Sequence, residues 1–261
     1  MSDPVTIDYD DDIAIVTVSN PPVNAASHGL RSALLDGLET IATDGRASAV
    51  VLIGAGRNFI AGADIREFGK PPKSPGLPDI IEIVEAFPVP VVCVVHGATL
   101  GGGLEVALGA HRRIALSSAM LGLPEVTLGI LPGAGGTQRT PRLVGVAKAL
   151  DLILGGKPVG AAQALDIGLV DVLAEGDDPR AAGIAEARQI LAGEVAARRV
   201  GDLAVTPDPE AIAAAREKST VHPMLVFAVT KISLGWSDSP SSGLSRRRTV
   251  PWTRPAAPAA P

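Results

Sequence analysis

In the first part of the chain, segments with the hydrophobic pattern of a strand alternate with segments that have the pattern of a helix. Residues 12–19 alternate apolar and polar side chains and are rich in β-branched types, which predicts a strand. In residues 28–42, leucine and isoleucine recur at helical spacing, which predicts an amphipathic helix. Residues 48–54 form an apolar run typical of a strand covered on both faces. The same succession of helix and buried strand is repeated by a helical pattern at 78–86 and an apolar run at 90–95. This order predicts an α/β fold with right-handed crossovers.

The strand pattern fades after about residue 147, where helical patterns take over. Helices and one short strand are predicted as follows: helices at 148–155, 161–166, 179–197 and 209–218, and a strand at 169–173. We expect a core domain at residues 1–200 and a helical C-terminal region at 201–240. Residues 241–261 are rich in proline and have no period, which predicts a disordered tail.

Composition narrows the classes of partner. The 261 residues are 46% hydrophobic, enough for a large core, and the net charge of −5 supplies no basic face for nucleic acid. The single cysteine, Cys93, lies in an apolar run, which predicts a buried inert thiol and excludes an intrachain disulfide. The N-terminus has no leader pattern, and no apolar stretch reaches the roughly 18 residues of a membrane span. We therefore expect a cytoplasmic protein that contacts neither nucleic acid nor membrane.

Two glycine-rich turns follow predicted strands. Residues 96–105 place three glycines at a helix start, where exposed backbone N–H groups and the helix dipole favour an oxyanion. A tight connection or a dinucleotide loop would also need glycine, but the run at 101–103 lacks the G-x-G-x-x-G spacing. Residues 58–67 form the second turn, with small side chains at 61–63. Because both turns leave parallel strands, we expect them at the edge where open α/β sheets bind ligands.

Two glutamates lie in segments that are otherwise short of charge. Glu105 follows the three glycines within an apolar run, and Glu125 lies in the glycine-rich and apolar segment 122–136. Glutamates are rarely buried without a reason, although each could cap a helix or pair with an arginine, for which Arg112, Arg113 and Arg139 are available. An apolar pocket raises a carboxyl pKa, and two carboxylates that share it titrate at different pH values. The pair therefore predicts one general base and one general acid.

Metal and serine chemistry have little support in the sequence. His96 and His111 are too isolated to form a metal cluster, so we expect no metal. No G-x-S-x-G elbow is present to hold a nucleophilic serine. Acid–base chemistry at the two glutamates is the best supported alternative.

Three segments together resemble the enoyl-CoA hydratase (crotonase) family. They are Ala-Gly-Ala-Asp-Ile-Arg at 61–66, His-Gly-Ala-Thr-Leu-Gly-Gly-Gly-Leu-Glu at 96–105, and the long segment at 123–139. The resemblance covers residues 5–200 and is closest to the hydratase part of multifunctional fatty-acid oxidation enzymes. It implies a spiral of ββα turns followed by a helical trimerisation region, assembled as a trimer or a dimer of trimers. Coenzyme A would be part of the acyl-CoA substrate, and no separate cofactor is expected.

The resemblance also implies roles for individual residues. The N–H groups of Ala63 and Gly102 would form an oxyanion hole for the thioester carbonyl. Glu105 and Glu125 would hold the attacking water, although the sequence does not decide which is the base. The main chain of four residues is expected to contact the adenine end of coenzyme A: Ala61, Asp64, Ile65 and Arg66. Gly133 is expected to border the acyl pocket.

Hydration of a trans-2-enoyl-CoA in fatty-acid β-oxidation is the predicted reaction, because both glutamates are present. An enoyl-CoA isomerase and a non-catalytic homologue that binds coenzyme A are the alternatives. Residues 243–261 depart from the family, since three consecutive arginines and a proline-alanine tail replace the usual amphipathic helices. This departure favours the non-catalytic alternative or a shortened form of a longer hydratase–dehydrogenase.

Overall fold

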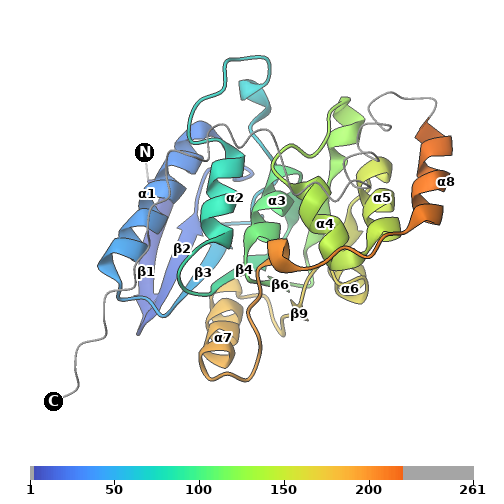
Figure 1. Cartoon of the computed structure of the whole chain (residues 1–261). Coiled ribbons are helices and arrows are strands. Elements are labelled where there is room, and N and C mark those ends of the chain that lie inside the picture. The colour runs from blue at the N-terminus through green and yellow to red at the C-terminus, as the bar shows by residue number, and fades with distance from the viewer. Residues whose placement is uncertain (1–2, 220–261) are drawn as a thin grey trace.

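A mixed sheet forms the centre of the computed structural model, which describes residues 3–219 (Figure 1). Its six strands run in the order β1-β2-β3-β4-β6-β9, with β1 antiparallel to β2 and all later neighbours parallel. The strands are β1 (Val5–Asp10), β2 (Ile13–Val18), β3 (Ala49–Gly54), β4 (Val91–Val95), β6 (Arg112–Ala115) and β9 (Val172–Leu173). The central parallel strands β3 and β4 are apolar on both faces because helices cover both faces of the sheet there.

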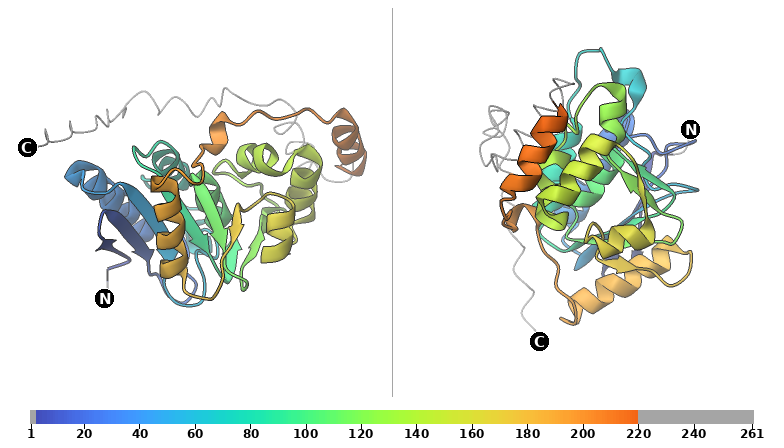
Figure 2. Two further views of the ribbon diagram at one scale, coloured as in Figure 1. Left: turned by 90° about the horizontal axis from the view of Figure 1, so that it is seen from below. Right: turned by 90° about the vertical axis from the view of Figure 1, so that its right-hand side faces the viewer.

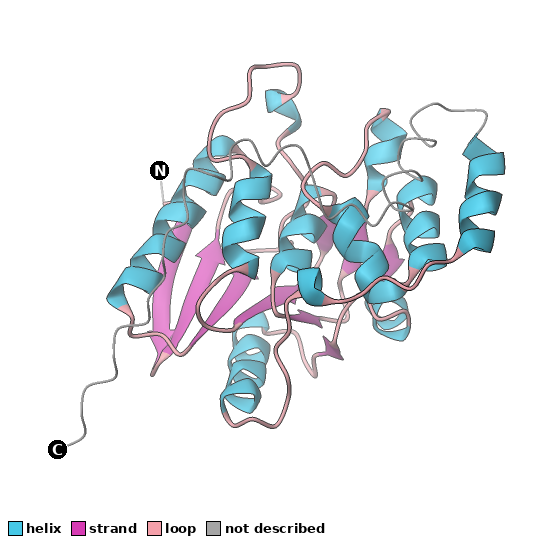
Figure 3. Cartoon of the chain, viewed as in Figure 1, coloured by secondary structure: helices cyan, strands magenta, loops and turns pink. Residues whose placement is uncertain are grey.

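Helices cover the two faces of this sheet unequally. Helices α1 (His28–Asp44), α2 (Leu77–Glu85) and α3 (Gly102–Gly109) pack side by side on one face (Figure 3). Helix α7 (Pro179–Leu191) packs on β3 and β4 from the opposite face, as the view from below shows (Figure 2). Successive strand residues alternate between these layers: Val50 and Leu52 join the core under the three helices, and Val51 joins the core under α7.

A second, three-stranded sheet connects the core to the remaining helices. Its order is β5-β7-β8, with β5 (Ala98–Leu100) parallel to β7 (Met120–Gly122) and β7 antiparallel to β8 (Val159–Gly160). The remaining helices are α4 (Gly136–Val144), α5 (Val146–Gly155), α6 (Ala161–Asp166) and α8 (Pro209–Ser219), and the short 3₁₀ turns are η1 (Ile65–Glu67), η2 (Pro124–Leu128) and η3 (Val200–Asp202). Helix α8 packs on α5.

The predicted α/β architecture is confirmed, with two corrections. The strand β1 was not predicted, nor were the short strands β5 to β8. The helix predicted at 179–197 is wrong beyond residue 191, because Gly193 adopts a left-handed φ of 75° that ends the helical path. Within the C-terminal region predicted at 201–240, α8 confirms helix over 209–219; residues 220–240 and the tail at 241–261 lie outside the described residues.

The buried charges of β6 are paired. Arg113 of β6 is 1% exposed, and its guanidinium lies 2.6 Å from the carboxylate of Asp171. Its neighbour Arg112 pairs with Glu186 of α7 at 2.5 Å. Cys93 is fully buried, and burial raises the pKa of its thiol, which confirms the predicted inert environment. Among residues 3–219, no helix is long and apolar enough to cross a bilayer.

Candidate active site

Both glycine-rich turns lie at the carboxyl ends of neighbouring parallel strands, as predicted. The turn after β4 passes through β5 into α3, and the turn after β3 leads to η1. The N–H of Gly101 donates to the carbonyl of Gly122 at 2.8 Å, which fixes the start of α3 against β7. Because η2 follows β7 directly, this contact brings the segment of Glu125 to the N-terminal end of α3, where Glu105 lies in the first turn.

Glycine at position 101 lets the two glutamate segments approach closely. Gly101 has a φ of 50°, and a Cβ atom there would lie 3.1 Å from Oε1 of Glu125. Its carbonyl accepts the N–H of Glu105 at 2.9 Å. Gly136 has the same role beside the other carboxylate, since a Cβ atom there would lie 3.0 Å from Oε1 of Glu105. A side chain at either position would crowd a carboxylate.

The two carboxylates are buried and differ in their hydrogen bonds. Glu105 is 3% exposed, and its Oε1 accepts the N–H groups of Ala134 and Gly136, both at 2.8 Å. Glu125 is 9% exposed, and its Oε2 has no hydrogen-bond partner within the described part of the chain. One oxygen of the pair is therefore available to a ligand.

The alternative that an arginine neutralises each glutamate is wrong. The three arginines named for that role pair elsewhere: Arg112 with Glu186, Arg113 with Asp171, and Arg139 with Glu85 at 2.6 Å. No ion pair to Glu105 or Glu125 is formed by any of the residues that the structure describes. The carboxylate of Glu105 therefore depends on main-chain donors and on the more distant charge of Arg139, and Glu125 experiences the charge of Glu105.

Burial raises the pKa of both carboxyl groups. Desolvation raises the pKa of Glu105, although the N–H groups of Gly136 and Ala134 counteract it by stabilising the carboxylate. Desolvation, with the negative charge of Glu105 as the second cause, raises the pKa of Glu125 to about 7. At neutral pH a proton can therefore remain on Glu125 while Glu105 keeps two donors suited to its ionised form.

The predicted oxyanion-hole residues lie beside each other. A Cβ atom built on Gly102 would be 3.4 Å from the backbone nitrogen of Ala63 and 2.5 Å from Cδ2 of Leu77. Neither the N–H of Ala63 nor that of Gly102 finds an acceptor among residues 3–219. Gly102 is also the first residue of α3, where the helix dipole adds partial positive charge. Both N–H groups are therefore available to an incoming oxygen.

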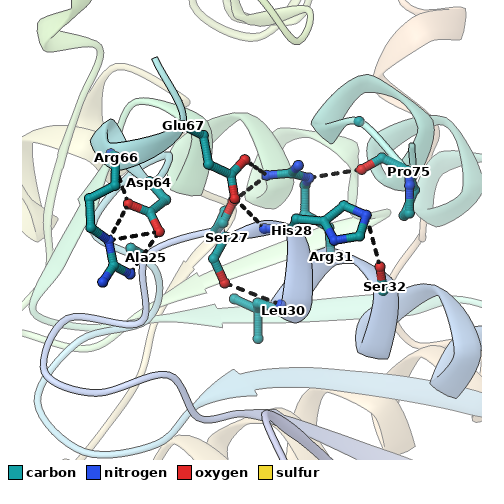
Figure 4. Close-up of polar contacts among 12 residues, drawn as sticks. Ala25, Ser27, His28, Leu30, Arg31, Ser32, Asp64, Arg66, Glu67 and Pro75 are labelled. Atoms are coloured by element: carbon teal, nitrogen blue, oxygen red, sulfur yellow. Dashed lines mark hydrogen bonds and ion pairs between the residues drawn. The ribbon is translucent and has the colours of Figure 1, made fainter. Parts of the chain in front are cut away.

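The residues predicted for coenzyme A lie just beyond this point. The N–H of Ala61 already donates to the carbonyl of Val23 at 3.1 Å, so only its carbonyl is left for a ligand. Asp64 is buried and accepts the N–H of Arg66 at 3.0 Å, and its carboxylate pairs with the Arg66 guanidinium at 2.8 Å (Figure 4). The side chains of Ile65 and Arg66 are exposed. These residues adjoin Ala63 in the chain, Ala61 before it and residues 64–66 after it.

Gly133, the residue predicted for the acyl pocket, lies next to a donor that the sequence did not reveal. It is exposed and precedes Ala134, whose N–H holds Glu105. The donors Ala134 and Gly136 were missed because their contribution comes from the main chain, although the three glycines within residues 133–136 were a signal that the backbone approaches other groups closely there.

The histidines are held by backbone groups. The Nε2 of His96 lies 3.0 Å from the carbonyl oxygen of Gly54, and Nδ1 of His111 accepts the N–H of Val91 at 2.9 Å. Within the described residues, no group of three or more His, Cys, Asp or Glu side chains could hold a metal ion.

Comparisons with known proteins agree on one family. Residues 8–208 match the model of the family described as enoyl-CoA hydratase/isomerase. A Bacillus subtilis protein named "Probable enoyl-CoA hydratase" is 42% identical over 207 residues, which cover 77% of this chain and 79% of that protein. The crystal structure of an enoyl-CoA hydratase from Bacillus anthracis has a TM-score of 0.67 at 30% identity and covers 89% of both chains.

A longer relative is matched over part of its length. The peroxisomal bifunctional enzyme of Danio rerio is 50% identical over 163 residues, which cover 62% of this chain and 23% of that enzyme. The chain therefore spans about a quarter of this relative and most of the Bacillus proteins.

The electrostatic coupling of the two glutamates can be tested directly. Glu105→Gln removes the negative charge that helps to raise the pKa of Glu125, so that pKa should fall below about 7 while burial keeps it above its ordinary value of 4.5. Infrared titration of the Glu125 carboxyl in isotope-labelled protein measures this shift. Glu175→Gln, at an exposed position, should leave it unchanged. An unaltered or higher Glu125 pKa in Glu105→Gln would show that the carboxylates do not interact.

Proposed function

Because the chain belongs to the enoyl-CoA hydratase/isomerase family, we propose that it is an enoyl-CoA hydratase of fatty-acid β-oxidation. It adds water reversibly across the double bond of a trans-2-enoyl-CoA thioester to give a 3-hydroxyacyl-CoA. The observation that carries this proposal is a pair of buried carboxylates, Glu105 and Glu125, near two backbone N–H groups. Within the described part of the chain, neither carboxylate forms an ion pair and neither N–H group has an acceptor. Hydration needs both parts, since a proton must leave water and negative charge must develop on the thioester oxygen.

The backbone donors stabilise that developing charge. As the oxygen of water bonds to C3, electrons move through C2 to the thioester carbonyl and give an enolate-like state. The N–H groups of Ala63 and Gly102 donate to this oxygen, and the dipole of α3 contributes partial positive charge at the same point. Removal of one such donor typically costs about 3–4 kcal/mol of transition-state stabilisation.

The hydrogen bonds of the two glutamates favour different roles. Glu105 takes the proton from water, because the N–H groups of Ala134 and Gly136 stabilise its carboxylate and fix its orientation. Glu125 gives a proton to C2, because its pKa of about 7 keeps a large fraction of it protonated near neutral pH. Transfer of one proton from Glu105 to Glu125 then restores the starting state, and the reverse sequence dehydrates the product.

The remaining assignments follow from the family and stay proposals. Main chain at Ala61 and at residues 64–66 contacts the adenine end of coenzyme A, and Gly133 borders the acyl pocket. The assembly is a homotrimer or a dimer of trimers, formed through the helical C-terminal region. A cytoplasmic location is a prediction from the sequence.

Loss of either carboxylate should abolish most of the activity. Glu105→Gln and Glu125→Gln keep the side-chain shape but cannot exchange the proton, so each should lower kcat for crotonyl-CoA by at least about 10²-fold and leave coenzyme A affinity nearly intact. Disappearance of the enoyl thioester absorbance measures turnover, and calorimetry measures binding. Glu175→Gln is the matched control, with an expected kcat equal to that of the unaltered protein. A loss of less than about tenfold in both site variants would contradict the two-carboxylate mechanism.

The donor role of Gly102 has a test that spares the helix. Proline is tolerated at the first helical position, where Gly102 lies, so Gly102→Pro removes the N–H without breaking a hydrogen bond of α3. We expect kcat to fall by about 10²- to 10³-fold. Gly102→Ala keeps the N–H and separates the crowding of Leu77 from the loss of the donor. Equal kcat values for the two variants would count against the donor.

A further inference from the structure

Arg31 of α1 is a buried cation that joins three separate segments. It is 8% exposed, and its guanidinium donates to the carbonyl of Ala26 at 2.7 Å, to Oε2 of Glu67 at 2.9 Å and to the carbonyl of Pro75 at 2.9 Å. Figure 4 shows Arg31 between Glu67 and Pro75. A buried guanidinium is costly unless its donors are satisfied, so this arrangement constrains all three segments at once.

Two of these segments border the nitrogen of Ala63. The N–H of Ala26 donates to the carbonyl of Gly62 at 2.8 Å, and Ala26 forms an isolated parallel bridge with Ala63. Glu67 ends the turn η1, which begins two residues after Ala63. Arg31 therefore holds both the segment that pairs with Ala63, at Ala26, and the segment that follows Ala63 in the chain, at Glu67.

The third segment covers the other donor. Pro75 precedes Leu77, the first residue of α2, and Cδ2 of Leu77 lies 2.5 Å from the position that a Cβ atom of Gly102 would occupy. A shift of the turn at Pro75 would therefore move the side chain that packs on Gly102. Through Pro75 and Ala26, one guanidinium is connected to both N–H donors.

Glu67 completes the arrangement as the counterion. Its Oε1 accepts the N–H of His28 at 2.6 Å, at the N-terminus of α1. Burial opposes its ionisation, but the hydrogen bond from His28 and the pair with Arg31 hold the pKa of Glu67 below its ordinary value. Glu67 is thus charged at neutral pH and ties η1 to the start of α1.

We propose that Arg31, with Glu67 as its counterion, is a positioning residue for the oxyanion hole and keeps the N–H groups of Ala63 and Gly102 directed at one point. The inference rests on the proposed hydratase function. Neither side chain touches the reacting atoms, so its effect is on the alignment of donors that stabilise the transition state. Misplacement of a catalytic group by about 1 Å can cost on the order of 10²-fold in rate.

Three variants and one matched control test this role. Arg31→Gln and Glu67→Gln should each lower kcat for crotonyl-CoA at least tenfold and change KM less than threefold. Arg31→Lys keeps the charge but lacks the planar guanidinium that reaches acceptors from both Nε and NH1, so its kcat should lie between that of Arg31→Gln and that of the unaltered protein. Arg112→Gln removes another partly buried ion pair, on the α7 side of the sheet, and should lower thermal stability without lowering kcat of the folded protein.

Cinnamoyl-CoA gives a second readout that does not need turnover. Its absorbance shifts to longer wavelength when the thioester carbonyl is polarised, so the bound ligand reports the two N–H donors. The shift should shrink in Arg31→Gln and Glu67→Gln and persist in Arg112→Gln. Unaltered protein that gives the shift without hydrating crotonyl-CoA would overturn the hydratase function and still leave the positioning role measurable.

The outcomes decide between positioning and general stability. Folded Arg31→Gln and Glu67→Gln with kcat within twofold of the unaltered protein and a full absorbance shift would overturn the inference. An equal loss of kcat in Arg112→Gln would also overturn it, because the effect would then follow stability alone. If Arg31→Gln does not fold, Glu67→Gln decides, since its amide oxygen can still accept the N–H of His28 while its NH2 group replaces the oxygen that accepts from Arg31, so that only the contact with Arg31 is lost.

Discussion

Burial of two carboxylates, neither of which pairs with an arginine among residues 3–219, is the constraint on which the site depends. Desolvation alone would neutralise both groups, and the N–H groups of Ala134 and Gly136 offset part of that cost at Glu105. No such donors reach Oε2 of Glu125 from the described residues, and burial with the charge of Glu105 raises the pKa of Glu125 to about 7. The different hydrogen bonds of two otherwise similar side chains are the basis on which we propose a base and an acid.

The sheet provides the frame that makes this arrangement possible. Parallel pairing of β3 with β4 brings their carboxyl ends to one edge, where one turn presents Ala63 and the other presents Gly102. Helices on both faces leave little freedom for these strands, so the turns start from fixed points. Arg31 then joins three connections that lie outside the sheet, which in the proposal links the packed core to the alignment of the donors.

Much of this was predictable from the sequence, and the failures have physical causes. The long strands and α1 to α3 have clear hydrophobic periods. The two glutamates were recognisable as candidate site residues because they lie in apolar, glycine-rich segments, which are not typical of exposed glutamates. Strand β1 was missed because an edge strand stays half exposed and its acidic residues weaken the apolar signal. Strands of two or three residues have no measurable period. Donors such as Ala134 act through the main chain, and the partners of Arg31 depend on tertiary contacts.

Isotope incorporation tests the central claim most directly. Purified protein is incubated with crotonyl-CoA in water labelled with ¹⁸O and deuterium, and the product is analysed by mass spectrometry and NMR. If water is added between the two glutamates, the product formed by the unaltered protein should carry one ¹⁸O on the C3 hydroxyl and one deuterium at C2. The double variant Glu105→Gln/Glu125→Gln should form no such product. Deuterium at C2 or C4 with a displaced double bond and no ¹⁸O would contradict hydration and indicate an isomerase, and unlabelled, unchanged thioester bound to the protein would indicate a non-catalytic homologue.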